Sequence, residues 1–319
     1  AHLYRCCVAS PCVPFQPHIA TMHGPNVSPA NGCQWQRALL QLKHMRQSTV
    51  TPNIFKYNAA ISACGKGRQW LLASAHLCEM RRWKVAPDTI SYNAAISACE
   101  KCTNWSEALV HLREMRQHTV ETDAIGYSTA ISSCAKGGQW LLAMTQLREM
   151  LFRHVAPDVV CYNAAISACE KGGQWLSALE QLRGMRQQQL EPDVISYSAA
   201  ISACEKCGQW PAALAQLRLM FQRRLQLDAI VFNAAISACE KGGQWSLVSE
   251  QLSLMRQWHV LPNVISYSAA ISACEKGGQW LLAMVLLRQM RQRSLQPNVL
   301  SYNAAISACE KGGQWLLAW

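Results

Sequence analysis

The sequence predicts an all-α protein built as a solenoid of 35-residue helix-turn-helix repeats. Eight aromatic residues, from Tyr57 to Tyr302, lie 35 positions apart, and nine tryptophans keep the same interval from Trp35 to Trp315. Within each interval, apolar residues recur with helical spacing. A fixed period of this length without insertions is the signature of stacked units that share one continuous core.

The unit that starts at Val159 illustrates the first helix. Its apolar residues at i, i+3, i+4 and i+7 are Tyr162, Ala165, Ile166 and Cys169. This spacing places them on one face of a helix. Gly172 and Gly173 follow, and paired glycines suit the left-handed conformation at a helix C-terminus. We expect the helix to begin behind an N-cap serine. The candidate N-caps in different units are Ser91, Ser196, Ser266 and Ser301.

A second helix follows the glycines. Its apolar face consists of Trp175, Ala178, Leu179, Leu182 and Met185. We expect Pro192 to stop this helix. The equivalent prolines are Pro52, Pro87, Pro157, Pro262 and Pro297. Neither helix can bury its apolar face within one hairpin, so neighbouring units are expected to complete the core.

The period divides the chain into three parts. Residues 54–319 hold eight units, which start at positions 54, 89, 124, 159, 194, 229, 264 and 299, the last one truncated. Residues 31–53 are interpreted as a degenerate half repeat that keeps only a second helix. Residues 1–30 contain no acidic residue, several prolines and three cysteines. They are interpreted as an irregular leader or the remnant of a targeting segment.

Composition favours an anionic partner. The formal net charge is +11 and the pI is near 9.0, which suits nucleic acid. No apolar run reaches about 18 residues, so we expect no membrane contact. The eight cysteines that recur once per unit are expected to be small buried hydrophobes in a reducing compartment. They are Cys64, Cys99, Cys134, Cys169, Cys204, Cys239, Cys274 and Cys309.

The sequence predicts a binding protein, not an enzyme. It contains no H-x-E motif with a downstream CxxC, no phosphate-binding glycine loop and no Ser/His/Asp spacing. Cys99/Cys102 and Cys204/Cys207 have CxxC spacing, but no second CxxC or histidine pair accompanies them. We interpret each as a core cysteine followed by a cysteine in the turn. We therefore expect no metal and no cofactor.

A unit that reads V-I-S-Y-N-A-A-I-S-A-C-E-K-G-G, with Trp, Ala-Leu, Leu, Met and a closing Pro-Asp after it, resembles the pentatricopeptide repeat. The likeness covers residues 33–319. The tetratricopeptide repeat has a 34-residue period and a different consensus. The resemblance implies a right-handed α-solenoid of the P-type, although some members of the family carry a C-terminal catalytic domain. The near-identity of the units resembles arrays of dinoflagellate algae.

Two positions vary between units only within a narrow chemical range. The residue after the aromatic is Asn58, Asn93, Ser128, Asn163, Ser198, Asn233, Ser268 or Asn303. The residue that closes the unit is Asp88, Asp123, Asp158, Asp193, Asp228, Asn263 or Asn298. These short donors and acceptors suit the Watson–Crick edge of an unstacked base. The alternative is that Asn and Ser start a helix while Asp and Asn cap the next one.

In pentatricopeptide arrays, the resemblance implies, these two positions together select one nucleotide per unit. Asn with Asp implies U, Ser with Asp implies G, Asn with Asn implies C or U, and Ser with Asn implies A. The implied target is 5′-UUGUGYA-3′, and Asn303 favours a further pyrimidine. An apolar residue in each unit would wedge between neighbouring bases. These residues are Phe55, Ile90, Ile125, Val160, Ile195, Ile230, Ile265 and Leu300.

A lysine recurs just before the turn of each unit. The set is Lys66, Lys101, Lys136, Lys171, Lys206, Lys241, Lys276 and Lys311. A row of ammonium groups suits the phosphates of a single strand. Six of the eight follow a glutamate, however, so a solvated charged face is the alternative. Five phosphate contacts would give a slope of about −3.5 in a plot of the logarithm of RNA affinity against the logarithm of salt concentration, which we call the salt slope.

The expected function is sequence-specific binding of single-stranded RNA by a monomer in an organelle, the chloroplast before the mitochondrion. There it would act in RNA processing, stability or translation. The alternative is a scaffold like those of tetratricopeptide proteins, with a peptide in its concave groove. Such a scaffold would show varied chemistry on that face.

Overall fold

The computed structural model describes residues 53–314, together with residues 35–38, 40, 42 and 44. The predicted leader, most of the half repeat and Pro52 lie outside the described residues. Two kinds of helix alternate along the described chain. The first helices are α2 (Ile54–Lys66), α4 (Thr89–Lys101), α6 (Ala124–Lys136), α8 (Val159–Lys171), α10 (Val194–Lys206), α12 (Ala229–Lys241), α14 (Val264–Lys276) and α16 (Val299–Lys311). The second helices are α3 (Trp70–Arg82), α5 (Trp105–Gln117), α7 (Trp140–Phe152), α9 (Trp175–Gln187), α11 (Trp210–Gln222), α13 (Trp245–Gln257) and α15 (Trp280–Gln292).

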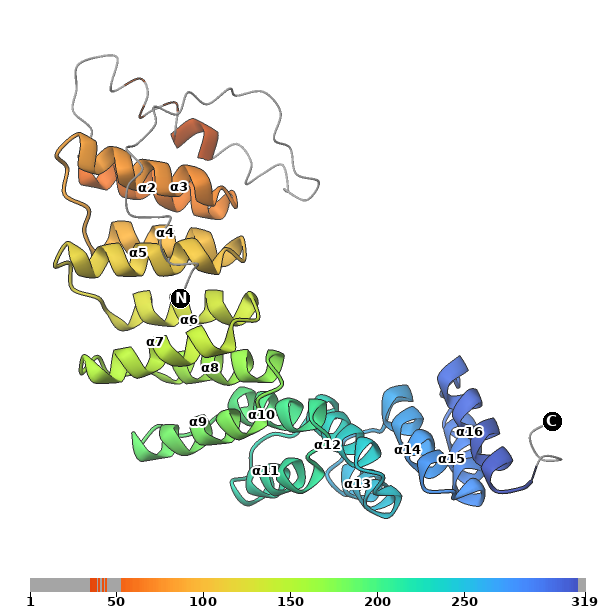
Figure 1. Cartoon of the computed structure of the whole chain (residues 1–319). Helices are drawn as coiled ribbons and strands as arrows, with labels where there is room; N and C mark the ends of the chain where they lie inside the picture. Colours follow the sequence, from red (N-terminus) through yellow and green to blue (C-terminus); the bar gives the residue numbers. More distant parts are fainter. Residues whose placement is uncertain (1–34, 39, 41, 43, 45–52, 315–319) are drawn as a thin grey trace, which may run out of the picture.

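The helix pairs stack into a bent array, which confirms the predicted all-α solenoid (Figure 1). Each first helix from α4 to α14 packs against the first helices of both neighbouring units and against the second helices on either side. Among the described residues, no two second helices approach each other this closely. In the C-terminal half, α10, α12, α14 and α16 lie on the inner side of the bend, and α11 and α13 on the outer side. We call the exposed side of the first helices the inner face.

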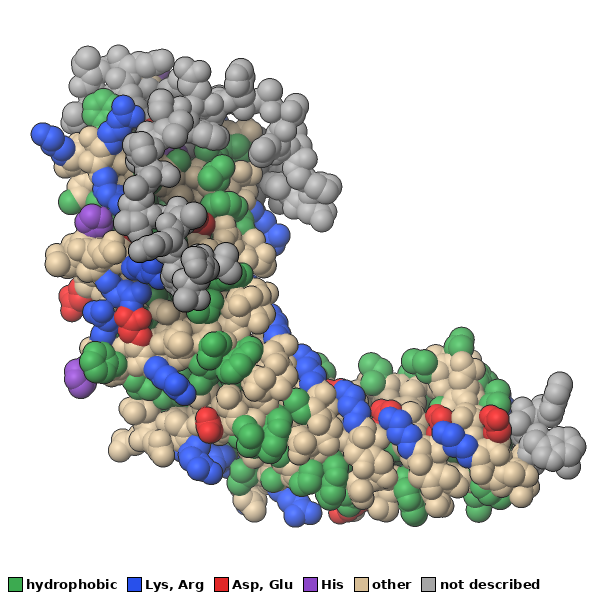
Figure 2. All heavy atoms as spheres, in the orientation of Figure 1, with side chains coloured by type: hydrophobic (Ala, Val, Ile, Leu, Met, Phe, Trp, Pro, Cys, Tyr) green, Lys and Arg blue, Asp and Glu red, His purple; other side chains and the backbone are tan. Residues whose placement is uncertain are grey.

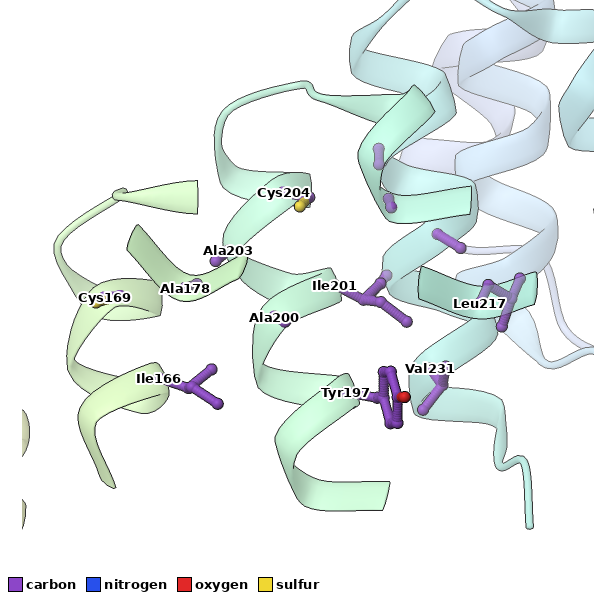
Figure 3. Close-up of a cluster of buried hydrophobic side chains, with 14 of the residues drawn as sticks. Ile166, Cys169, Ala178, Tyr197, Ala200, Ile201, Ala203, Cys204, Leu217 and Val231 are labelled. Carbon is purple, nitrogen blue, oxygen red and sulfur yellow. The ribbon is translucent and has the colours of Figure 1, made fainter. Parts of the chain in front are cut away.

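The core is continuous from one unit to the next. Tyr197, at 0% exposure, packs with Ile201 of its own helix beside Leu217 and Val231 (Figure 3). Its equivalents from Tyr57 to Tyr267 are buried in the same way. Burying side chains of this size stabilises the fold by about 1.5–3 kcal/mol each. None of the described helices combines the length and the apolar character needed to cross a bilayer.

The recurrent cysteines belong to this core. All eight of the predicted set are buried, and none of the described cysteines forms a disulfide. Burial raises the pKa of the Cys64 and Cys99 thiols to about 12, so these thiols stay protonated. Cys102, at the turn, donates to Arg68 O at 3.2 Å. The CxxC pairs are thus a core cysteine and a turn cysteine, and the described residues contain no cluster that would hold a metal ion.

The prediction of serine N-caps was wrong by three residues. The N-cap of α10 is Asp193, which has extended backbone geometry and accepts a hydrogen bond from Ser196 N at 2.8 Å. Ser196 is the third residue of the helix, and its Oγ accepts a hydrogen bond from Asp193 N, which completes a capping box. The same correction applies to Ser91, Ser266 and Ser301, which follow the N-caps Asp88, Asn263 and Asn298.

The prolines do not stop the second helices, which was also predicted wrongly. α9 ends at Gln187, five residues before Pro192. The chain turns at Gln189, whose φ is +58°, and Leu190 N donates to Met185 O at 2.9 Å. This is the Schellman pattern of a helix end. Units with Thr122 or Leu227 in place of proline end at the same position, so the proline is not required.

The two glycines after a first helix have different tasks. Gly173 adopts the left-handed region with φ +63°, as the sequence predicts. Gly172 has φ −81° and instead lies against Trp140 of the preceding unit. A Cβ atom at Gly172 would meet Trp140 Cδ1 at 2.4 Å. The first glycine therefore lets consecutive hairpins approach each other closely.

Candidate functional site

The two restricted positions meet across the boundary between units. The fifth residue of one first helix lies beside the N-cap of the next first helix. Asn58 Nδ2 donates to Asp88 Oδ1 at 3.2 Å, and Asn93 Nδ2 donates to Asp123 Oδ1 at 3.0 Å. The pairs Asn163/Asp193, Asn233/Asn263 and Ser268/Asn298 are joined at 3.2, 3.4 and 3.4 Å. Residues 30 apart are thus hydrogen-bonded in five of the seven pairs, whereas in Ser128/Asp158 and Ser198/Asp228 the serine donates within its own helix. We call each of the seven a reading pair.

The closing Asp of a unit is a helix cap and a member of a reading pair at the same time. Asp88 Oδ1 accepts from Ser91 N at 2.8 Å as well as from Asn58. Burial acts to raise the pKa of this carboxyl, but the hydrogen bonds from Ser91 and Asn58 outweigh it, so the pKa lies below its ordinary value. The pKa of Asp193 is lowered for the same reasons. Both groups are carboxylates at neutral pH and can only accept hydrogen bonds.

A serine completes the reading pair in several units. Ser91 Oγ donates to Asn58 Oδ1 at 2.5 Å, and Ser196 and Ser266 do the same to Asn163 and Asn233. These serines are fully buried. The asparagine carbonyl therefore accepts from the serine hydroxyl, and one of the two amide hydrogens is donated to the closing residue of the unit. One amide hydrogen of Asn58 remains for a ligand.

Units with Ser at the fifth position are arranged differently. Ser128 Oγ donates to Ile125 O at 3.0 Å, and Ser198 Oγ donates to Val194 O at 2.6 Å. Because the single hydroxyl hydrogen is used within the helix, the oxygen can only accept further bonds. Ser268 Oγ donates mainly to Val264 O at 2.7 Å, with the more distant Asn298 Oδ1 at 3.4 Å as a second acceptor, and it lies 2.8 Å from Ser301 Oγ. Ser is also shorter than Asn, so these units leave more room above the pair.

An apolar row runs along the inner face beside the reading pairs. All eight predicted wedge residues are exposed, from 61% for Val160 to 76% for Phe55. They occupy the second position of every first helix. Large apolar side chains at this exposure are available to stack on flat ligands. Asn303 is exposed as well, and its pair position does not occur in this sequence.

The lysine row is divided into paired and unpaired members. Five lysines form an ion pair with the glutamate that lies 36 residues earlier, at distances between 2.9 and 3.2 Å. These lysines are Lys136, Lys206, Lys241, Lys276 and Lys311. Figure 2 shows basic and acidic side chains alternating along the inner side of the C-terminal half. For Lys101 and Lys171, the residue 36 positions earlier is Gly65 or Ala135 instead of a glutamate, and both lysines are exposed.

Comparison with known proteins agrees with this architecture. The profile described as the pentatricopeptide repeat domain matches residues 33–67, 110–172 and 217–277. The PPR repeat family profile matches residues 52–101, 157–206 and 262–311, and the PPR repeat profile matches residues 90–120 and 195–225. Together they extend from residue 33 to residue 311. The chain belongs to the pentatricopeptide repeat family.

Solved pentatricopeptide repeat structures have a similar fold. The maize protein PPR10 is 22% identical over 89% of this chain, with a TM-score of 0.55. PPR10 in complex with an 18-nt psaJ RNA element is also 22% identical, with a TM-score of 0.54. The chain spans 45–46% of the length of these relatives. No curated protein sequence matches the chain significantly.

Sequence reasoning located the reading pairs of this pentatricopeptide repeat array but missed two features. It assigned Ser91 and its equivalents to capping alone, although their hydroxyls also contact the preceding unit. It read the glutamates as neighbours of the lysines that follow them, whereas Glu205 pairs with Lys241 of the next unit. Both contacts join residues 33 or 36 positions apart. A comparison of equivalent positions in adjacent units is the signal that would have found them.

Proposed function

We propose that this pentatricopeptide repeat protein binds single-stranded RNA on its inner face, with one reading pair for each base. The observation that carries the proposal is the hydrogen-bond inventory of the pairs. Each type of pair leaves a different set of donors and acceptors unused, and each set matches one Watson–Crick edge. The RNA complex of the similarly folded PPR10 supports the ligand class.

The Asn–Asp pairs fit uracil. Asn58 keeps one amide hydrogen to donate, and Asp88 keeps carboxylate lone pairs to accept. The uracil edge offers an N3–H donor between two carbonyl acceptors, so it meets both groups. A uracil is therefore expected opposite Asn58, Asn93 and Asn163.

The Ser–Asp pairs fit guanine. Ser198 has turned its hydrogen to Val194 O, so it presents an acceptor, and Asp228 presents a second acceptor. The guanine edge offers two adjacent donors, N1–H and N2–H. The shorter serine also makes room for the larger purine. The pair Ser128/Asp158 is of the same type.

The two pairs that close with Asn complete the set. Asn298 Oδ1 accepts from Ser301 N, which leaves the Asn298 amide hydrogens to donate beside the accepting Ser268. One donor and one acceptor match adenine. In Asn233/Asn263 the Asn263 oxygen is occupied, so both amides donate outward, which favours the N3 and O2 acceptors of cytosine over uracil.

The resulting target is 5′-UUGUGYA-3′, with C preferred at the sixth base. The amino end of the array is placed at the RNA 5′ end by resemblance to the family. We further propose an organellar protein, chloroplast before mitochondrion, that occupies a transcript segment and so guides its processing, stability or translation. The net charge of +11 supports a polyanionic ligand.

The test measures the affinity of the chain for RNA that contains UUGUGCA, for a scrambled RNA of the same composition and for a peptide pool. We expect the matched RNA to bind at least tenfold more tightly than the scrambled one, since each wrong base costs about 1–3 kcal/mol in comparable base readout. Equal affinity for the two RNAs would refute base reading. Binding of peptide but not of RNA would establish the scaffold alternative.

A further inference from the structure

The buried serine of the following first helix closes a ring of hydrogen bonds around each reading asparagine. In the fourth unit, Asn163 Nδ2 donates to Asp193, Asp193 accepts from Ser196 N, and Ser196 Oγ donates to Asn163 Oδ1 at 2.5 Å. If the amide group turned over, so that its oxygen and nitrogen exchanged places, these hydrogen bonds would be lost. The side chain is held with its free N–H pointing in one direction.

The second unit lacks this ring. Residue 126 occupies the position that is serine after Asn58, Asn163 and Asn233, and it is Gly126. Asn93 still donates to Asp123, but Asn93 Oδ1 is buried and has no hydrogen-bond partner. A Cβ atom at Gly126 would lie 2.7 Å from Asn93 Oδ1, closer than side-chain carbons normally approach, so any side chain at position 126 requires Asn93 to shift. An unpaired buried carbonyl is unfavourable and gains by turning to any available donor.

Two of the three units that read with Ser lack the hydroxyl. The residues that follow Ser128 and Ser198 at the same position are Cys161 and Val231, and each reading serine donates to its own helix instead. The hydroxyl accompanies Asn58, Asn163 and Asn233, where an amide has two distinguishable ends, and it is also present after Ser268, whose Oγ lies 2.8 Å from Ser301 Oγ.

We propose that the third residue of each following first helix is a positioning residue for the reading asparagine of the preceding unit. The inference rests on the proposed function and adds a third residue to each pyrimidine-reading unit. A serine holds the asparagine carbonyl away from the base, so that only the N–H donor faces it. Without the serine, the carbonyl of Asn93 is free to accept from the amino group of cytosine. The second unit therefore discriminates U from C less well than the fourth.

Gly126→Ser tests the proposal by installing the missing hydroxyl, and Gly126→Ala is the matched control that adds Cβ alone. The measurement is the affinity ratio for U over C at the second base, with the ratio at the fourth base as an internal reference. Because the Cβ of either variant displaces Asn93 Oδ1, the two variants are compared with each other: we expect the ratio at the second base to be roughly tenfold higher in Gly126→Ser than in Gly126→Ala, the effect of one satisfied hydrogen bond. Both variants gain helix propensity over glycine and share the same Cβ contact with Asn93, so their melting temperatures should change alike.

Ser196→Ala is the converse variant. It should lower the U over C ratio at the fourth base and leave the second base unaffected. The helix cap is retained, because Asp193 still accepts from the backbone N–H of residue 196. An equal response to Gly126→Ser and Gly126→Ala, or no response to either, would overturn the positioning role. If the unaltered chain has no base preference at the second and fourth positions, the proposed function itself fails.

Discussion

Asp193 separates the two interpretations of the restricted positions. It caps α10 through Ser196 N and also joins Asn163. Capping needs only a short side-chain oxygen, and Asn263 and Asn298 cap α14 and α16 equally well. Under the proposed function, the selection of U or G needs the carboxylate, because an amide presents donors that a carboxylate lacks. The interpretation as caps is therefore right about the closing residue, and the reading role stays a prediction for substitutions at this position to test.

Asp193→Asn is expected to move the fourth-base preference from U towards C. The variant converts the fourth unit into a copy of Asn233/Asn263, in which both amides donate outward. Fold stability should change by only a few tenths of a kcal/mol, because Asp and Asn are comparable N-caps. The measurements are relative affinity for U and C at that base and the melting temperature. An unchanged preference with full stability would leave Asp193 as a cap and nothing more.

The same residues explain how far the sequence alone predicts the site. Asn163 and Asp193 were identified because their variation between units is restricted, which needs no geometry. Ser196 was assigned to the wrong position and task, since the hydroxyl contacts an asparagine 33 residues earlier. Neither local propensity nor helical periodicity contains information about such contacts. The precise hydrogen-bond partners, which decide the chemistry of each pair, came only from the structure.

At the scale of helices, periodicity predicted both apolar faces correctly. Tyr162, Ala165, Ile166 and Cys169 are all buried. The helix ends were predicted less well, because they depend on backbone conformation after the last turn. Prolines are conspicuous in the sequence, yet the second helices end at a residue in the left-handed region, such as Lys84 or Gln189. Residues of many types adopt that region here, so no sequence signal marks it.

Thr103→Gly should stabilise the array, and Gly138→Thr should destabilise it. The two residues occupy equivalent turns, with φ +57° at Thr103 and φ +70° at Gly138. The left-handed conformation costs a residue with a Cβ atom about 1–2 kcal/mol of folding free energy. The greater freedom of glycine in the unfolded chain partly offsets this difference. Thermal unfolding should show shifts of a few degrees in opposite directions. Shifts of the same sign would show that the backbone conformation of these turns does not decide their stability.

At the scale of the whole molecule, the ion pairs change the expected electrostatics. Five of the eight lysines are held by a glutamate of the preceding unit, whereas Lys66, Lys101 and Lys171 have no such glutamate. If only these three meet phosphates, the salt slope is about −2 and not −3.5. Phosphate contacts would then concentrate in the first, second and fourth units.

Glu205→Ala should release Lys241 and make the slope steeper by about 0.7, the value of one added contact to a single strand. Glu310→Ala is the matched control, because within the described residues no lysine pairs with Glu310. The measurement is the affinity for UUGUGCA RNA over a series of salt concentrations. Equal slopes for the two variants would mean that the ion-paired lysines do not approach the RNA.

The stacking of units ties each reading pair to a fixed place along the inner face. Because each first helix packs on the next, the pair in one unit is built partly from the following one. A change in one pair is then expected to affect one base and leave its neighbours unchanged. This independence is the central claim about the molecule.

The most direct test is Ser128→Asn, which makes the third unit an Asn–Asp pair with Asp158. Affinities are measured for RNAs that differ only in the third base of UUGUGCA. We predict that the preference at this base changes from G to U by at least tenfold, while the preferences at the other bases are retained. A preference that stays with G, or that changes at several bases together, would contradict the assignment of one unit to one base.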